Sequence, residues 1–522
     1  MLLVHLEVPN ITIMEARNFI TAREMVQDNH WLLTTINGEA RYQKPPLPTW
    51  LTAMSGMLFG INNVWALRLP AALMVLFSGM CIYYLSLKLK LPKIQSLNNS
   101  LILVTSFYIF AIIIEEPWDI FAHGFMLAGL YFLFRLFEEK SILWKNALLA
   151  AFFVGLSMMS KGPVSLYALF LPFLISYGIV YKFKDFKAKF LPLIGFVMLF
   201  IIIGGLWFLY VRLADPEAFL EIATKETANW SSYNIKPFYY YWNFFIQSGL
   251  WAIPAFISLL YPYLIKRVAH KKDYQFSFWW TIIAVILLSL IPEKKARYLV
   301  PVLIPLAMNT GFYIHYLISD FSNLKRKIET IPVYFNFGLI AVISLSVPFA
   351  LFLLLKDGFE NQPISYLFTS LATLLIGILL IRNLYFKKFS NVFYLTILFV
   401  VSLAVFGLPL SSNLNHNPEF KSINSLHQFE KSNKISSYSI GEIAPELLWD
   451  YNGILKDIYK NEKLKIPAEP NFGLLVTNED KEIIKAQLSI AYNLKLIETY
   501  NLNVGSKSKD RLIREYYLVS KK

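Results

Sequence analysis

Cysteine and charge are both scarce in this chain of 522 residues. Cys81 is the only cysteine, which excludes an intramolecular disulfide and a cysteine-based metal site. The seven histidines show no spacing typical of metal ligands, so no histidine metal site is predicted. Charged residues make up 16% of the sequence and hydrophobic residues 56%, whereas soluble domains carry about a quarter charged residues. This composition indicates a membrane protein.

Apolar runs without Asp, Glu, Lys or Arg recur along the chain, and most reach the roughly 20 residues that a spanning helix needs. Two shorter runs, Ile120–Phe134 and Asn146–Ser160, fit either buried core helices or spans extended by their flanks. We therefore predict a mainly α-helical, polytopic membrane protein with about twelve transmembrane helices. The longer runs are Leu69–Leu87, Ile94–Ile114, Gly162–Tyr181, Phe190–Val211, Phe244–Ile265, Tyr274–Pro292, Tyr298–Ser319, Ile331–Leu355, Ile364–Ile381 and Phe389–Asn415.

The net charge of +14 comes from basic residues that gather in alternate loops, such as Lys182–Lys189 and Lys325–Lys327. The positive-inside rule makes these loops cytoplasmic. Their regular alternation with apolar runs argues against nucleic acid as the partner and for membrane lipid. The loops expected on the outer side are residues 1–68, Glu115–Asp119, Ser160–Lys161, Arg212–Asn243, Glu293–Arg297, Lys356–Pro363 and the chain after about residue 412.

An outer position for residues 1–68 requires that something carried them across the membrane. Met1–Ile13 is too short to span and lacks the basic region and cleavage site of a signal peptide. We favour a first spanning helix upstream of Met1 over an amino terminus that crosses unaided.

Residues 1–68 are predicted to form an extracytoplasmic first loop with two amphipathic surface helices. Glu15–Asp28 places its apolar residues largely on one side, and Leu47–Phe59 supplies a second apolar helix. Between them, Lys44–Pro48 cannot be helical throughout, because proline lacks a donor and restricts the preceding residue.

Residues 69–411 are then the transmembrane domain, and 412–522 a small soluble α/β domain. The soluble stretch Arg212–Asn243 contains an aromatic run, Phe238–Trp242, suited to the membrane interface. In the last domain, the expected strands are Ser437–Ile440, Phe472–Val476, Leu494–Glu498 and Tyr516–Ser520, and the expected helices are Gly441–Tyr451 and Lys481–Asn493.

A series of short motifs begins in the first loop and continues farther along the chain: Glu15, Arg17, Arg23–Met25, Asn37-Gly38, Lys44–Pro46, Trp50, Phe59-Gly60, Arg68, Asp119, Ser160–Pro163, Trp207 and Lys294–Pro301. The chain is similar to the polytopic GT-C glycosyltransferases, in the branch of 4-amino-4-deoxy-L-arabinose transferases and protein O-mannosyltransferases. Each motif alone is weak, and the resemblance rests on their order and spacing together.

This resemblance implies a glycosyltransferase of the cytoplasmic (inner) membrane that uses a polyprenyl-phosphate sugar at the outer face. The sugar passes, with inversion, to a lipid A, glycolipid, glycan or protein acceptor. Such chemistry needs cations for the phosphate leaving group and a carboxylate on the acceptor side of the sugar. The implied catalytic carboxylates are Glu15 and Asp119.

The implied phosphate-binding residues are Lys44, Lys161, Lys294, Arg297 and Tyr298. Arg17, Arg68 and Glu226 are assigned to the structure of the loops or to acceptor binding. Each has a simpler alternative. Glu15 and Asp119 suit the first turn of a helix, lysines near lipid snorkel, and Arg17 and Arg68 suit loop salt bridges.

Two positions depart from the family pattern. Met14 stands where the family has its presumed catalytic Asp, and Gln43 where it has a Glu associated with a divalent metal. Three interpretations follow. Glu15, helped by Asp119, takes the catalytic role of the missing Asp, or the acceptor is a phosphate that needs no strong base, or activity is lost. No metal ligand and no certain cofactor is assigned, and a divalent metal stays open.

Two other classes of function compete with the transferase. A flippase or transporter of lipid-linked sugars needs a continuous polar path, but the apolar runs hold almost no charge and no internal repeat is present. A non-catalytic family member is suggested by Met14.

Overall fold

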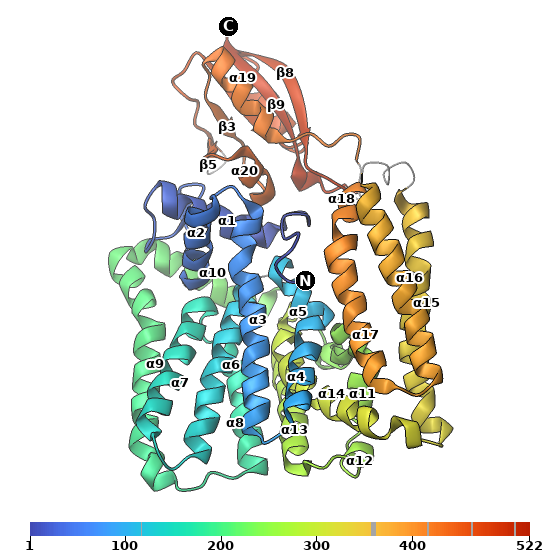
Figure 1. Ribbon diagram of the computed structural model, residues 1–522. Coiled ribbons are helices and arrows are strands. Elements are labelled where there is room, and N and C mark those ends of the chain that lie inside the picture. Colours follow the sequence, from blue (N-terminus) through green and yellow to red (C-terminus); the bar gives the residue numbers. More distant parts are fainter. Residues whose placement is uncertain (116, 356–361, 415–416, 461–462, 506–507) are drawn as a thin grey trace. The chain divides into compact units, whose positions relative to one another are not determined.

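The computed structural model describes residues 1–115, 117–355, 362–414, 417–460, 463–505 and 508–522 (Figure 1). Contacts between residues divide the chain into two compact units. The first unit comprises Met1–Val8 and Tyr42–Leu410, and the second comprises Pro9–Arg41 and Ser411–Lys522. This division differs from the sequence-based one, because Pro9–Arg41 of the first loop groups with the carboxyl-terminal part.

The first unit is a bundle of apolar helices. Within the described ranges, nine helices are long and apolar enough to cross a membrane. The chain is therefore a multi-pass membrane protein. Seven of them are α3 (Val64–Lys88), α6 (Pro117–Glu138), α7 (Leu143–Lys161), α9 (Phe186–Ala214), α13 (Lys271–Leu290), α15 (Lys327–Leu355) and α16 (Pro363–Tyr385). The other two are longer helical segments, Ala296–Asn323, which contains α14 (Val300–Asp320), and Phe389–Leu410, which contains α17 (Phe389–Ser402).

The predicted twelve spans are not confirmed, because three apolar runs do not form single long helices. The run Ile94–Ile114 becomes α4 (Lys93–Thr105) and α5 (Phe107–Glu115), which meet at a 46° bend and make a tenth span if counted as one. The run Gly162–Tyr181 begins with a π-helical turn and gives only a short apolar helix, Leu166–Val180, whose second part is α8 (Leu171–Val180).

The third run, Phe244–Ile265, is broken into a 3₁₀ segment (Phe244–Trp251), α11 (Ala252–Ser258) and α12 (Tyr261–Leu264). Gly249 causes the first break, because its φ of 67° is not helical. Side chains satisfy the backbone at the second break. The carbonyl of Ser258 accepts hydrogen bonds from Tyr274 Oη at 2.8 Å and from Asn309 Nδ2 at 2.9 Å. Interrupted backbone inside a membrane bundle requires such partners.

Two further helices of this unit lie outside the long spans. The predicted helix α2 spans Leu47–Phe59, with Pro46 at its N-cap. Helix α10 (Pro216–Ser232) occupies the predicted soluble stretch and is followed by a 3₁₀ turn, Phe238–Tyr241. Of the predicted outer loops, Glu116 and residues 356–361 lie outside the described residues.

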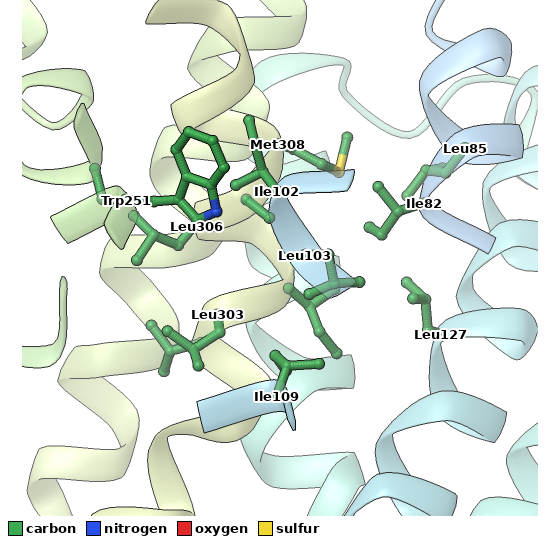
Figure 2. Close-up of a cluster of buried hydrophobic side chains, with 14 of the residues drawn as sticks. Ile82, Leu85, Ile102, Leu103, Ile109, Leu127, Trp251, Leu303, Leu306 and Met308 are labelled. Carbon is green, nitrogen blue, oxygen red and sulfur yellow. The ribbon is translucent and has the colours of Figure 1, made fainter. Parts of the chain in front are cut away.

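The core of the bundle is packed by aliphatic side chains from several helices (Figure 2). Leu103 of α4, Leu127 of α6 and Leu303 of α14 are buried together there, with Ile82 of α3 nearby. Trp251 closes one side and donates from Nε1 to Thr105 Oγ1 at 2.9 Å. This bond satisfies the indole donor inside an apolar core.

The second unit contains a five-stranded mixed sheet in the order β4-β3-β7-β9-β8. The predicted small α/β domain is thus present. Its strands are β3 (Ser437–Ser439), β4 (Lys456–Asp457), β7 (Asn471–Val476), β8 (Tyr492–Asn501) and β9 (Ile513–Lys521), beside the pair β5 (Tyr459–Lys460) and β6 (Lys463–Leu464). Its helices are α18 (Ser411–Leu414), α19 (Leu426–Asn433), α20 (Pro445–Tyr451) and α21 (Lys481–Leu488).

Helix α1 (Ile13–Gln27) and the hairpin of β1 (Thr35–Ile36) and β2 (Glu39–Ala40) complete the second unit. Arg23 of α1 is buried, donates to Asn452 Oδ1 at 2.9 Å and lies over the ring of Trp449. Glu24 accepts a hydrogen bond from Thr35 Oγ1 at 2.6 Å. The structure therefore differs from the predicted surface helix, because the polar side of α1 is used for tertiary contacts.

The close approach of α4 and α14 gives a test of the bundle packing. A Cβ added to Gly311 of α14 would meet Asn99 Oδ1 at 1.7 Å, whereas one at Gly338 of α15 would meet nothing within 4 Å. We expect Gly311→Ala to destabilise the fold by about 1–3 kcal/mol through overpacking. Thermal unfolding in detergent should show a lower Tm for Gly311→Ala and not for the control, Gly338→Ala. Equal Tm values would contradict this packing.

Candidate functional site

The first turn of α6 brings two lysines from other elements together. The carboxylate Oδ1 of Asp119 forms an ion pair with Lys161 Nζ. In the same turn, the ring of Trp118 lies 4.5 Å from Lys44 Nζ, a cation–π contact. Trp118 and Asp119 are both about 1% exposed. This turn therefore forms a buried platform, Trp118–Asp119, that holds two ammonium groups in place.

Local sequence explains why these groups meet. Helix α6 begins at Pro117 and α7 ends at Lys161, and a short connection makes the two helices antiparallel neighbours. The start of α6 and the end of α7 consequently lie at the same end of the bundle. Gly162 ends α7 with φ at 66°, a conformation that glycine adopts readily. Asp119 and Lys161 also suit the dipoles of their helix ends.

The ring of Tyr298 is the second gathering point for cations. The centroid of the ring lies 5.5 Å from Lys161 Nζ, 5.5 Å from Lys295 Nζ and 5.9 Å from Arg297 Cζ. The Tyr298 hydroxyl donates to Glu293 Oε1 at 3.1 Å. Glu293 Oε1 also forms an ion pair with Lys295 Nζ at 2.6 Å. Lys161 thus connects the Trp118–Asp119 platform to this second group.

The loop that carries these residues is braced by the segment after α10. The backbone of Ile235 pairs with that of Glu293 as an isolated bridge. The Tyr241 hydroxyl donates to the Lys295 carbonyl and accepts from the Lys295 amide, both at 3.0 Å. Gln247 Nε2 donates to the carbonyl of Ala296 at 2.7 Å. The position of Lys295 is therefore fixed by side chains far earlier in the chain.

Lys294, a predicted phosphate ligand, has a different setting from its neighbours. Its ammonium group donates to the carbonyl of Ile291 at 2.5 Å and to that of Lys236 at 3.1 Å. The residue is 3% exposed, and burial lowers the pKa of its amine. The contacts of Lys294 hold the loop together, whereas Lys295 faces Tyr298 and Tyr233.

The other predicted residues have contacts of a different kind. Arg68 is buried in α3 and donates to the Leu6 carbonyl at 2.5 Å. Glu226 is exposed on α10. Arg17 and Glu15 belong to the second unit. There Glu15 Oε2 accepts from the Thr12 amide at 3.1 Å, in a capping box at the start of α1.

The cluster around Trp118 and Tyr298 carries a surplus of positive charge. Lys44, Lys161, Lys295 and Arg297 contribute four positive charges, and Asp119, Glu293 and Glu115, which shares Tyr108 as a neighbour with Arg297 and Asp119, contribute three negative ones, a difference of 4 − 3 = +1. Arginine and lysine gathered in this way are the usual partners of phosphate groups. A phosphate-binding cluster is the chemistry that this arrangement favours.

Several members of the cluster were not among the residues predicted from sequence. Trp118, Glu293 and Tyr233 are brought in by the fold, whereas Lys295 belongs to the basic run Lys294–Arg297 that already indicated a phosphate-binding group in the sequence. As for metals, the described part of the chain holds no group of three His, Cys, Asp or Glu residues that could bind an ion. We therefore derive no step through a metal.

Comparison with known proteins first defines the class of fold. A family model described as dolichyl-phosphate-mannose-protein mannosyltransferase matches residues 43–207. The structure superimposes on the crystal structure of ArnT from Cupriavidus metallidurans bound to undecaprenyl phosphate with a TM-score of 0.68 at 14% identity, over 99% of this chain and 95% of ArnT. The chain therefore has the fold predicted for it, that of the polytopic GT-C glycosyltransferases.

Particular relatives are found by sequence. The chain is 25% identical to the undecaprenyl phosphate-alpha-4-amino-4-deoxy-L-arabinose arabinosyl transferase of Photorhabdus laumondii, over 86% of this chain and 81% of that protein. It is 24% identical to an uncharacterized protein of Aquifex aeolicus, over 63% of each chain. With that Aquifex protein the match thus spans less than two thirds of the relative's length. The predicted resemblance to this group of transferases is confirmed.

The buried ion pair gives a test of the site. Removing the charge of Lys161 leaves the Asp119 carboxylate buried with a lost partner, which typically costs about 3–5 kcal/mol. We expect Lys161→Met to lower the Tm of the purified protein markedly. The matched control is Lys140→Met, because Lys140 is 88% exposed and lies 4.0 Å from Asp185. A Tm for Lys161→Met equal to that of the control would show that the pair does not form.

Proposed function

We propose that this protein is a membrane glycosyltransferase that takes a sugar from a polyprenyl-phosphate-linked donor. It transfers the sugar, with inversion, to an acceptor at the outer face of the cytoplasmic membrane. The observation that carries the proposal is the cluster of four cations on Trp118, Asp119 and Tyr298 at one end of the bundle. The similarity to arabinosyl transferases supports it and favours a pentose-type sugar.

The surplus charge suits the chemistry of the leaving group. A polyprenyl-phosphate sugar is a phosphodiester with one negative charge, and loss of the sugar leaves a phosphomonoester with nearly two. Cations that are held rigidly before the reaction stabilise this developing charge without reorganisation. Lys44, Lys161, Lys295 and Arg297 would hold the phosphate, and the Tyr298 ring with Glu293 would keep Lys295 and Arg297 in place.

The ion pair of Asp119 bears on the choice of acceptor. The carboxylate of Asp119 is already engaged by the ammonium group of Lys161, so we assign it a positioning role and not that of a general base. A hydroxyl acceptor has to lose its proton during transfer, whereas a phosphate acceptor is already an anion. We therefore favour a phosphate group of lipid A or another glycolipid over a protein hydroxyl, with Asp119 positioning Lys161.

Glu15 keeps its proposed role on the acceptor side. Its carboxylate caps the start of α1 in the second unit, so its side chain has a fixed direction. Met14, one residue earlier, supplies no charge. An acceptor that needs no strong base is consistent with both residues.

Transfer in reconstituted membranes tests the proposal. Purified protein would receive radiolabelled polyprenyl-phosphate pentose or hexose, with lipid A and envelope protein as competing acceptors. We expect label in the lipid fraction, and a loss of kcat/KM on the order of 10- to 100-fold for Lys44→Ala and Lys295→Ala, because each removes a charge-assisted bond.

The control variant is Lys140→Ala, whose side chain is almost fully exposed, and it should retain wild-type activity. Label in the protein fraction would overturn the acceptor assignment. Movement of the carrier lipid across the bilayer without any transfer product would favour a flippase instead.

A further inference from the structure

Tyr42 is tied to the junction between α9 and α10. Its hydroxyl donates to Asp215 Oδ2 at 2.8 Å, and its ring packs edge-on against Trp207 at 6.5 Å. Tyr42 is only 6% exposed. Burial and the bond to Asp215 raise the pKa of its phenol, so the hydroxyl stays a donor across the physiological range.

Asp215 has two structural roles, one at the end of α9 and one at the start of α10. It is the C-cap residue of α9, and its second oxygen, Oδ1, accepts from the Ala218 amide at 3.3 Å in the first turn of α10. The carboxylate is thereby held in one orientation by the helix that follows it. Tyr42 consequently binds to a fixed point.

The distance along the chain from Tyr42 to Lys44 is short. Gln43 alone lies between them, so the two Cα atoms are at most about 7 Å apart. On the other side of Lys44, Pro45 and Pro46 are buried and lead directly into α2, and proline fixes the backbone φ. Lys44 therefore lies in a short bend that is anchored at both ends.

We propose that Tyr42 and Asp215 form a positioning pair that holds Lys44 over Trp118 for binding the donor phosphate. This inference rests on the proposed function. Neither residue needs to touch the substrate. A loose Tyr42 would let the ammonium group of Lys44 move, and small displacements of a positioned group cost binding and rate.

One segment of the chain, Asp215–Gln247, supports both groups of cations. It begins at Asp215, which holds Tyr42, and it ends with Tyr241 and Gln247, which bind the backbone of Lys295 and Ala296. The stretch from Asp215 to Gln247 thus reaches Lys44 through Tyr42 at one end and the Tyr298 cluster at the other. This explains why a tyrosine, rather than an apolar residue, suits position 42.

Direct binding of polyprenyl phosphate to the full-length protein in detergent tests the pair. We expect Tyr42→Phe and Asp215→Ala each to raise the Kd about fivefold, since each removes one hydrogen bond that positions a charge. In the Lys44→Ala background, Tyr42→Phe should cause no further loss, because the two residues act as one unit. A purely structural role would give additive losses. The matched control is Tyr181→Phe, which removes another tyrosine bond, to Asp273 Oδ1 at 2.6 Å.

The outcomes separate this inference from the proposed function. If Lys44→Ala weakens binding while Tyr42→Phe does not, or if the losses add, the positioning pair is refuted and the donor site stands. Wild-type protein that binds no polyprenyl phosphate would overturn the proposed function and the inference with it. Tm values close to wild type for Tyr42→Phe exclude misfolding as the cause of weaker binding.

Discussion

The ion pair between Asp119 and Lys161 is the contact on which the rest of the candidate site depends. Both side chains are nearly buried, with 2% and 10% of their surface exposed. Charges in such surroundings persist only when they are paired. The pair joins the start of α6 to the end of α7, and from there Trp118 reaches Lys44 and Lys161 reaches Tyr298. The pair is thus the direct contact between the two groups of cations.

The irregular segments of the bundle also depend on polar contacts with neighbouring segments. The 3₁₀ segment with its non-helical Gly249, the bent pair α4 and α5, and the loop before Tyr298 all interrupt regular helices. The breaks at Ser258 and Lys295 are satisfied by side chains of neighbouring segments. Backbone groups without water need such partners. The helices are therefore interrupted where polar side chains of neighbouring segments bind the backbone. The loop with Lys295, in the cation cluster, is one such interruption.

Much of the fold could be predicted from the sequence because hydrophobic length is a strong signal. Nine runs appear as long helices within the described ranges, and α2 has its predicted bounds. The single span predicted from the run Phe244–Ile265 was wrong, because hydropathy carries no information about a glycine with positive φ. The amphipathic pattern of α1 was equally ambiguous. A face with Arg23 and Glu24 suits water, and it also suits the tertiary partners that it finds.

The site was predicted in part. Lys44, Asp119, Lys161, Arg297 and Tyr298 come together in the first unit, although their roles remain proposals. Lys294 and Lys295 could not be distinguished from sequence, because side-chain direction in an irregular loop depends on what braces it. Tyr42 and Asp215 are 173 residues apart, and no local pattern connects them.

The most direct test of the central claim compares two lipids that differ only in the phosphate. Native mass spectrometry of the purified protein would be performed with polyprenyl phosphate and with the corresponding polyprenol. If the cluster on Trp118, Asp119 and Tyr298 is a phosphate site, the phosphorylated lipid should be retained at concentrations where the alcohol is lost, and added salt should reduce the difference. Equal retention of the two lipids would contradict the account.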